Sequence, residues 1–111
     1  MKVTLVPSAE FSRQFKRLAK KYKSLGKDYK IFKKSLLDDP FQGDDLGSGV
    51  RKIRMAIASK GKGKSGGARV LTLNVLVSGD AEVTLLTIYD KNEIENVPDN
   101  YIKCLVAETM K

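Results

Sequence analysis

The sequence predicts one α+β domain, with helices packed on a mostly antiparallel sheet in the element order β-α-α-β-β-β-α. A length of 111 residues fits a single domain spanning residues 1–111. Apolar residues at helical spacing lie before residue 38 and after residue 98. Alternating apolar residues fill most of the interval between them. Helices flanking a run of strands joined by turns are typical of this fold class.

The first third of the chain predicts a short strand and two helices. Residues 2–6 form the strand, which ends at Pro7, and Ser8 is a suitable N-cap for the first helix. Gly26 is the predicted end of that helix, and the 38–40 segment (Asp-Asp-Pro) ends the second. The apolar residues expected to face the core are Phe11, Phe15, Leu18, Tyr22 and Leu25 in the first helix and Tyr29, Phe32, Leu36 and Leu37 in the second.

The remainder predicts a loop, three strands and a last helix. Residues 40–49 are rich in Gly and Asp and predict the loop. Strands follow over 50–58, 68–77 and 82–89, and the last two are joined by a hairpin turn at 78–80. Pro98 and Asp99 begin the final helix, which buries Ile102, Leu105, Val106 and Thr109, and Cys104 beside that stripe is expected to be buried as well.

Composition excludes several kinds of chemistry. The chain has no histidine and one cysteine, which excludes a disulfide framework, zinc fingers and imidazole catalysis. It also lacks a set of acidic metal ligands, which favours a metal-free reaction, and no cofactor is expected. Its apolar runs are far shorter than the roughly 20 residues of a membrane span, and no secretory leader is visible, so we expect a cytoplasmic protein without a membrane partner. A net charge of +8 favours a polyanionic partner, most often nucleic acid.

Positive charge is concentrated in two segments. Residues 1–37 carry 11 basic and 2 acidic groups, and residues 51–69 carry 7 basic and no acidic groups. The second segment contains Lys60, Lys62 and Lys64, which alternate with glycines. Glycine lets a backbone approach a phosphate closely, and lysines supply point charges to it. The segment therefore predicts a phosphate-binding loop, and the alternative is a flexible, solvated hairpin tip.

Two other patterns favour structural explanations. Residues 58–65 fit a relaxed Walker A spelling, but a strand-like segment follows where a phosphate-binding loop needs a helix, so nucleotide binding is not expected. The four aspartates of residues 38–50 do not have the spacing of a calcium loop. Chemistry of helix ends and turns explains those aspartates better.

Further cations are expected near the basic loop. If the last two strands are antiparallel, Arg69 at the start of one lies near Tyr89 and Lys91 at the end of the other. Arg54 and Arg69 offer planar guanidinium groups that match phosphate oxygens. The basic face of the first helix, which includes Lys16 and Lys20, is either solvated surface or a further RNA contact.

Three segments together resemble the RelE/HigB-like toxins of bacterial type II toxin–antitoxin systems, and the HigB-type branch most closely. The segments are residues 51–54 (Arg-Lys-Ile-Arg), 60–69 (Lys-Gly-Lys-Gly-Lys-Ser-Gly-Gly-Ala-Arg) and 85–93 (Leu-Leu-Thr-Ile-Tyr-Asp-Lys-Asn-Glu). The resemblance implies a ribosome-dependent mRNA endonuclease that cuts codons in the ribosomal A site. It also implies a small antitoxin that masks the site, and operator DNA bound only through the toxin–antitoxin complex.

The resemblance also suggests roles for individual residues. Lys52, Arg54 and Arg69 match basic positions of the family, whereas Asn92 after Lys91 departs from a frequent basic pair. Tyr101 lies too early to match a functional tyrosine near the C-terminus of some members. For metal-free attack of the RNA 2′-hydroxyl, Lys60, Lys62 or Lys64 is the expected base or acid, with Lys91 next, because crowding by other cations lowers a lysine pKa. Arg54 and Arg69 would hold the phosphate oxygens, and Tyr89 would stack on a base.

Two alternatives from other classes remain open. A ParE-like gyrase inhibitor on the same fold would leave mRNA intact and act on DNA supercoiling. A non-catalytic RNA- or ribosome-binding module would bind with a steep salt dependence and cleave nothing.

Overall fold

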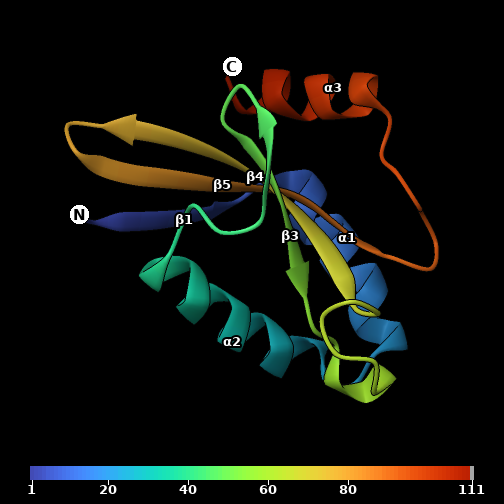
Figure 1. Cartoon of the computed structure of the whole chain (residues 1–111). Helices are drawn as coiled ribbons and strands as arrows, with labels where there is room; N and C mark the ends of the chain where they lie inside the picture. Colours follow the sequence, from blue (N-terminus) through green and yellow to red (C-terminus); the bar gives the residue numbers. More distant parts are fainter. Residues whose placement is uncertain (111) are drawn as a thin grey trace.

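The chain forms a five-stranded sheet with helices on both faces (Figure 1). The computed structural model describes residues 1–110. The elements are β1 (Val3–Pro7), α1 (Ala9–Lys21), α2 (Leu25–Asp38), β2 (Asp44–Gly47), β3 (Val50–Met55), the short 3-10 helix η1 (Ala58–Lys60), β4 (Ala68–Val77), β5 (Asp80–Asp90) and α3 (Asp99–Thr109). The strand order is β1-β5-β4-β3-β2, and only the β1–β5 pair is parallel. The predicted α+β class is confirmed.

The predicted element order is wrong at one point, because β2 lies inside the segment expected to be a loop. Arg51 on β3 holds that segment: its Nε donates to the Gln42 carbonyl and its Nη2 to the Gly43 carbonyl, each at 3.0 Å. All four residues of β2 are exposed. Such a strand has no buried alternation, so the sequence carries no signal for it.

Two predicted boundaries also differ. α1 ends at Lys21 and α2 begins at Leu25, so Gly26 lies in the first turn of α2 instead of ending α1. Tyr22 ends α1 because its backbone is extended, with φ −118° and ψ 109°. The strand predicted over residues 50–58 stops at Met55, and η1 follows because the Ala58 N–H donates to the buried Asp28 carboxylate at 3.1 Å.

Several local predictions are confirmed. The Ser8 hydroxyl caps α1 by accepting from the Phe11 N–H at 3.0 Å. Pro98 precedes α3 as its N-cap residue. Ser78 and Gly79 form the two-residue hairpin turn between β4 and β5, and both have positive φ, as a type I′ turn requires.

None of the helices within residues 1–110 is long and apolar enough to cross a membrane.

The sheet separates two apolar cores. The larger core lies under α1 and α2 and includes Phe11, Leu18, Leu25, Phe32, Leu36, Ile53, Val70 and Ile88. The smaller core lies under α3 and includes Leu71, Leu86, Tyr89 and Leu105. Leu37 and Cys104 are exposed, contrary to expectation, since each lies beside the buried stripe of its helix and not within it.

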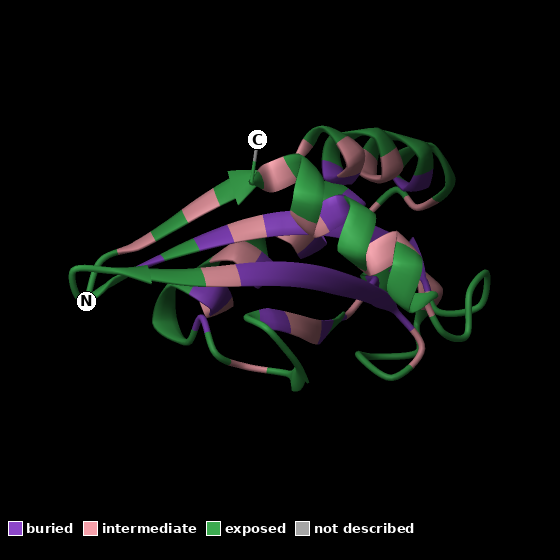
Figure 2. Cartoon of the chain, turned by 90° about the horizontal axis from the view of Figure 1, so that it is seen from above, coloured by how far each residue is buried: buried purple, intermediate pink, exposed green. Residues whose placement is uncertain are grey.

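Burial is uneven along the central strands. Figure 2 shows β4 and β5 buried at one end and exposed toward the hairpin turn. The buried end adjoins residues 58–67, so the basic loop is attached to the buried part of the sheet. We call residues 58–67 the cationic loop.

Candidate nucleic-acid interface

Three side chains form a row across the sheet next to the cationic loop. Arg54 on β3 pairs with Arg69 on β4, and Arg69 pairs with Tyr89 on β5. Directly paired residues of neighbouring strands project on the same face. Lys91 follows the row, and its N–H donates to the Gly67 carbonyl at 3.2 Å. The predicted clustering of Arg69, Tyr89 and Lys91 is therefore confirmed.

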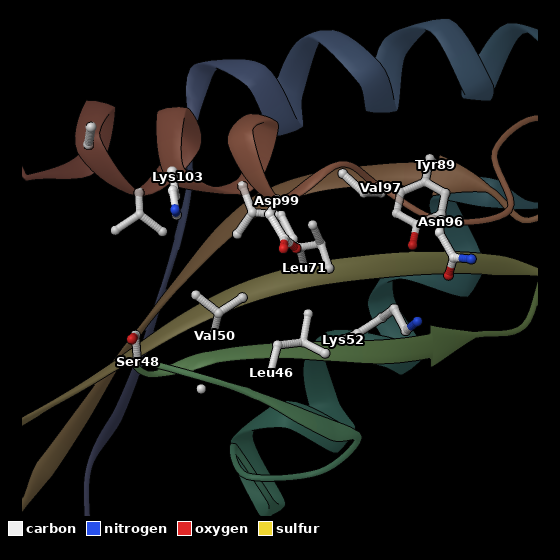
Figure 3. A pocket seen from close by; sticks show the side chains of 14 residues that line it. Leu46, Ser48, Val50, Lys52, Leu71, Tyr89, Asn96, Val97, Asp99 and Lys103 are labelled. Carbon is white, nitrogen blue, oxygen red and sulfur yellow. The ribbon is translucent and has the colours of Figure 1, made fainter.

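A large pocket adjoins this row on the α3 side of the sheet. It has a volume of about 740 Å³ and lies between α3, the β2–β3 turn and the sheet. Its lining is mostly apolar and includes Val50, Leu71, Ile102 and Val106. Figure 3 shows the Lys52 ammonium and the Tyr89 hydroxyl at one end of the pocket, together with Asn96. The pocket therefore offers a positive charge and a hydroxyl beside the Arg54–Arg69–Tyr89 row.

Arg54 of the row and four lysines around the row have no acidic partner among residues 1–110. Lys52 is half-buried and the other four are exposed; the five are Lys52, Arg54, Lys62, Lys64 and Lys91. Cations left without a carboxylate attract phosphate groups. This end of the sheet therefore carries positive charge without acidic partners, and its cations come from β3, the cationic loop and the residue after β5.

Glycine permits the close approach of the loop to β3. A methyl group on Gly67 would collide with the Met55 carbonyl oxygen and would lie 3.0 Å from the Ile57 nitrogen. Gly61 and Gly63 have φ of +69° and +61°, which is the left-handed region. Gly67 packs the end of the loop on the sheet, whereas the two earlier glycines turn the chain at exposed positions.

Arg69 has a different role from the expected one. The residue is 8% exposed, and its guanidinium donates to the carbonyls of Lys64, Ser65 and Ala68, at 3.1, 3.1 and 3.2 Å. Three of its N–H groups are therefore engaged by its own chain. Arg69 fixes the end of the cationic loop, and the expectation that its guanidinium is free to grip phosphate is wrong.

The expectation for Lys60 is also wrong. Its ammonium is nearly buried and lies 2.7 Å from Oδ1 of Asp90, instead of being crowded by other cations. It also lies over the Tyr22 ring, 5.5 Å from the ring centroid. Burial acts to raise the pKa of Asp90, but hydrogen bonds from Lys60 and Tyr22 outweigh it, and the pKa is lowered overall. Lys60 is thus held as a charged partner of Asp90.

Tyr89 does not offer its ring for stacking. The residue is 4% exposed, and its ring packs in the core under α3, so the predicted stacking on a base is wrong. Burial raises the pKa of the Tyr89 phenol, and the nearby Arg69 opposes this only in part. Its hydroxyl is therefore protonated at neutral pH and is a hydrogen-bond donor in the pocket.

The remaining predicted residues are placed as follows. Lys16 and Lys20 are exposed on α1, which packs in the core on the other side of the sheet from α3. Asn92 is exposed, and its backbone N–H donates to Asp90 Oδ1 at 3.0 Å. Tyr101 joins α3 to α1 through a hydrogen bond to Glu10. Tyr101 is therefore a structural residue that connects α3 with α1.

Two residues were missed by sequence reasoning. Asp90 is completely buried, and Tyr22 donates its hydroxyl to Asp90 Oδ2. In the sequence, Tyr22 appeared only as a member of the apolar stripe of the first helix. Asp90 directly follows the apolar run that ends at Tyr89, and this position was the one indication that its carboxylate is buried.

The aspartates of residues 38–45 have local structural roles. Asp39 accepts from the Phe41 N–H at 3.0 Å, and Asp45 accepts from the Gly47 N–H at 2.8 Å. Across residues 1–110, no three His, Cys, Asp or Glu side chains gather in an arrangement that would hold a metal ion. As expected, a strand and not a helix follows residues 58–65, which is not a nucleotide-binding arrangement.

The chain matches no known protein-family model. Membership of the RelE/HigB-like toxins, expected from the three segments quoted above, stays a prediction.

Proposed function

We propose that this protein is the toxin of a type II toxin–antitoxin pair, a cytoplasmic, ribosome-dependent mRNA endonuclease that a cognate antitoxin neutralises. One observation carries the proposal. Five cations without acidic partners, namely Arg54 and four lysines, lie in and around the Arg54–Arg69–Tyr89 row, beside a glycine-rich loop. A surface of this kind suits a bent, single-stranded phosphate backbone.

The chemistry is attack of an RNA 2′-oxygen on the adjacent phosphorus. The P–O5′ bond breaks, which leaves a 2′,3′-cyclic phosphate and a free 5′-hydroxyl. The 2′-hydroxyl must lose a proton, the phosphorus centre gains negative charge, and the 5′-oxygen must gain a proton. A surface with cations and a phenol, but no imidazole, supplies groups for each of these tasks.

Roles follow from which side chains are free. Arg54 and Lys52 neutralise the charge that develops on the phosphate oxygens. Lys62, Lys64 and Lys91 remain as proton-transfer groups, because Lys60 is paired with Asp90. The protonated Tyr89 hydroxyl donates a hydrogen bond to the phosphate or to the leaving oxygen. Arg69 acts indirectly by fixing the loop.

The test is translation of a defined mRNA with purified protein, with new 5′ ends mapped on ribosomes. We expect codon-phased cuts with wild type and at least about a tenfold loss with Arg54→Ala, as for removal of one charge-stabilising group. Lys34→Ala removes an exposed cation of α2 and is the matched control. The absence of phased cuts with wild type would contradict the proposal.

Parallel assays separate the alternatives. Intact mRNA together with blocked supercoiling by purified gyrase would indicate a gyrase inhibitor. Salt-dependent ribosome binding without any cleavage would indicate a binding module.

A further inference from the structure

The carboxylate at the end of β5 joins four parts of the chain. Asp90 Oδ1 accepts from the Lys60 ammonium at 2.7 Å and from the Asn92 N–H at 3.0 Å, while Oδ2 accepts from the Tyr22 hydroxyl. These donors belong to the cationic loop, the turn after β5 and the end of α1. Asp90 is completely buried. A buried carboxylate with three donors has one preferred geometry, because each unmade bond would leave a buried polar group unpaired.

Asp90 is one of several anchors of the cationic loop. Figure 1 shows the loop next to the end of α1 and to the segment that leaves β5. At the start of the loop, Ser24 accepts from the Ser59 N–H at 2.9 Å, and Asp28 accepts from the Ala58 N–H. At its end, Arg69 holds the carbonyls of Lys64 and Ser65. Among these loop contacts, only the Asp90 contact is a carboxylate–ammonium pair.

The anchored loop fixes the place of a free lysine. Arg54 and Lys64 both contribute to the lining of a small pocket of about 100 Å³ between α2 and β3, so these two residues lie close together at the edge of the sheet. Lys60 lies only four residues before Lys64, and the residues between them are exposed. If the Lys60–Asp90 pair opened, residues 61–63 would be held only by backbone turns and by the Ser65 hydroxyl, which donates to the Lys62 carbonyl. Arg69 would still hold the Lys64 carbonyl.

We infer that Asp90 is the positioning residue of the endonuclease site: it clamps Lys60 so that Lys62 and Lys64 stay in register with Arg54 around the RNA phosphate. The inference rests on the proposed function. Asp90 does not touch the RNA, and it acts through the loop lysines. Its loss therefore leaves the cations present but misplaced, and a misplacement of about 1 Å costs up to about 10²-fold in rate.

The first experiment compares kcat and KM for ribosome-dependent cleavage. We expect Asp90→Asn to lower kcat by about 10-fold to 10²-fold with little change in KM, and Tyr22→Phe to lower it in the same direction by less. Glu93→Gln is the matched control, since Glu93 is a nearby carboxylate paired with Arg17 outside the loop. Asp90→Asn should lower kcat much less in a protein that already carries Lys62→Ala and Lys64→Ala, because the effects of substitutions at coupled residues are not additive.

A merely structural role gives a different pattern. In that case Asp90→Asn lowers the melting temperature, kcat is unchanged below the transition, and the effects of the Asp90 and lysine substitutions multiply. An unchanged kcat, or effects that multiply, would overturn the inference.

Hydrogen exchange separates this inference from the proposed function. We expect the amides of residues 60–67 to exchange faster in Asp90→Asn and in Tyr22→Phe, and to keep the wild-type rate in Glu93→Gln. If wild type cuts no mRNA and the loop still loosens, the proposed function fails and the clamp survives as a structural device. Unchanged exchange in both clamp variants would refute the clamp even in an active enzyme.

Discussion

The two ends of the β4–β5 hairpin are built from the same two strands but are held very differently. At the end near the cationic loop, Ala68 pairs with Asp90 and both are completely buried. At the other end, Val77 pairs with Asp80, and residues 75–80 are exposed. Figure 2 shows the same contrast in burial. Apolar side chains such as Leu76, at 63% exposure, mark the free end, whereas the buried end gathers charged groups.

The contrast shows what the buried charges of this protein do. At the free tip a two-residue turn closes the hairpin with one side-chain contact, from the Lys2 N–H to Asp80 at 2.8 Å. At the loop end, the twelve residues 56–67 connect β3 to β4 by way of η1 and need several polar anchors to keep one conformation. Ordering a loop costs conformational entropy, so the order must have a compensating source in hydrogen bonds and packing.

The largest expected difference between the two ends comes from removing an aspartate at each. Asp90→Ala leaves the Lys60 ammonium nearly buried without its partner, which costs about 3–5 kcal/mol of unfolding free energy. Asp80→Ala removes an exposed hydrogen bond and is expected to cost less than about 1 kcal/mol. Urea unfolding of both variants measures the difference. Similar midpoints would mean that the Lys60–Asp90 pair does not anchor the loop end.

Glycine substitutions at the two ends of the hairpin test the same difference in stability. Gly67→Ala forces a methyl group against the backbone of β3 and is expected to destabilise the fold by about 1–3 kcal/mol or more. Gly79→Ala at the tip meets open space, so only its positive φ of +84° opposes it, at about 1 kcal/mol. Thermal melts of the two variants test this order. An equally mild effect at Gly67 would show that β3 and the loop can separate.

Acid should weaken the loop end selectively. The folded-state pKa of Asp90 is lowered, because its hydrogen bonds outweigh burial, so the carboxylate stabilises the fold above its unfolded pKa of about 3.9. That contribution is lost as the pH falls below about 4 toward the folded-state value. The difference in unfolding free energy between wild type and Asp90→Asn should therefore shrink over this range. A difference independent of pH would contradict the assigned charge state.

RNA binding should depend only on the end of the β4–β5 hairpin that carries the cationic loop. Lys62→Ala and Lys64→Ala are each expected to reduce the slope of log K against log salt by about 0.7 for single-stranded RNA. Each variant has a matched control in Lys34→Ala on α2. Filter binding to a short RNA at several salt concentrations gives the slopes. Unchanged slopes would show that these two lysines do not contact the RNA.

The smallest effect is expected at the hairpin tip. Leu76→Ser replaces an exposed apolar side chain, so stability should change by no more than about 0.5 kcal/mol and RNA affinity should stay the same. Urea unfolding and the same filter-binding assay check both. A substantial loss of stability or of RNA affinity would show that the hairpin tip contributes to folding or to binding, contrary to this expectation.

Local sequence patterns predicted most of the fold. The apolar periods of residues 11–36 and 68–89, the cap at Ser8 and the turn at Ser78-Gly79 all depend on near neighbours. The same logic failed for β2, whose exposed residues have no alternation and are held by Arg51 from the next strand. The register of β4 and β5 near the hairpin turn could be anticipated from that turn, but continued along the strands it would pair Arg69 with Ile88. The irregularity between Leu71 and Thr72 shifts the register by one residue and pairs Arg69 with Tyr89, and no local pattern predicted it.

By itself, the sequence determined that the chain is basic, that its cations cluster near one loop, and that no histidine or disulfide takes part. Only the tertiary structure decided which of those cations are free. Lys60 and Lys64 look alike in the sequence, but one is paired with a buried carboxylate from 30 residues away and the other lies exposed beside Arg54. A charge is neutralised by its neighbours in space, and those neighbours are set by how distant strands and helices pack.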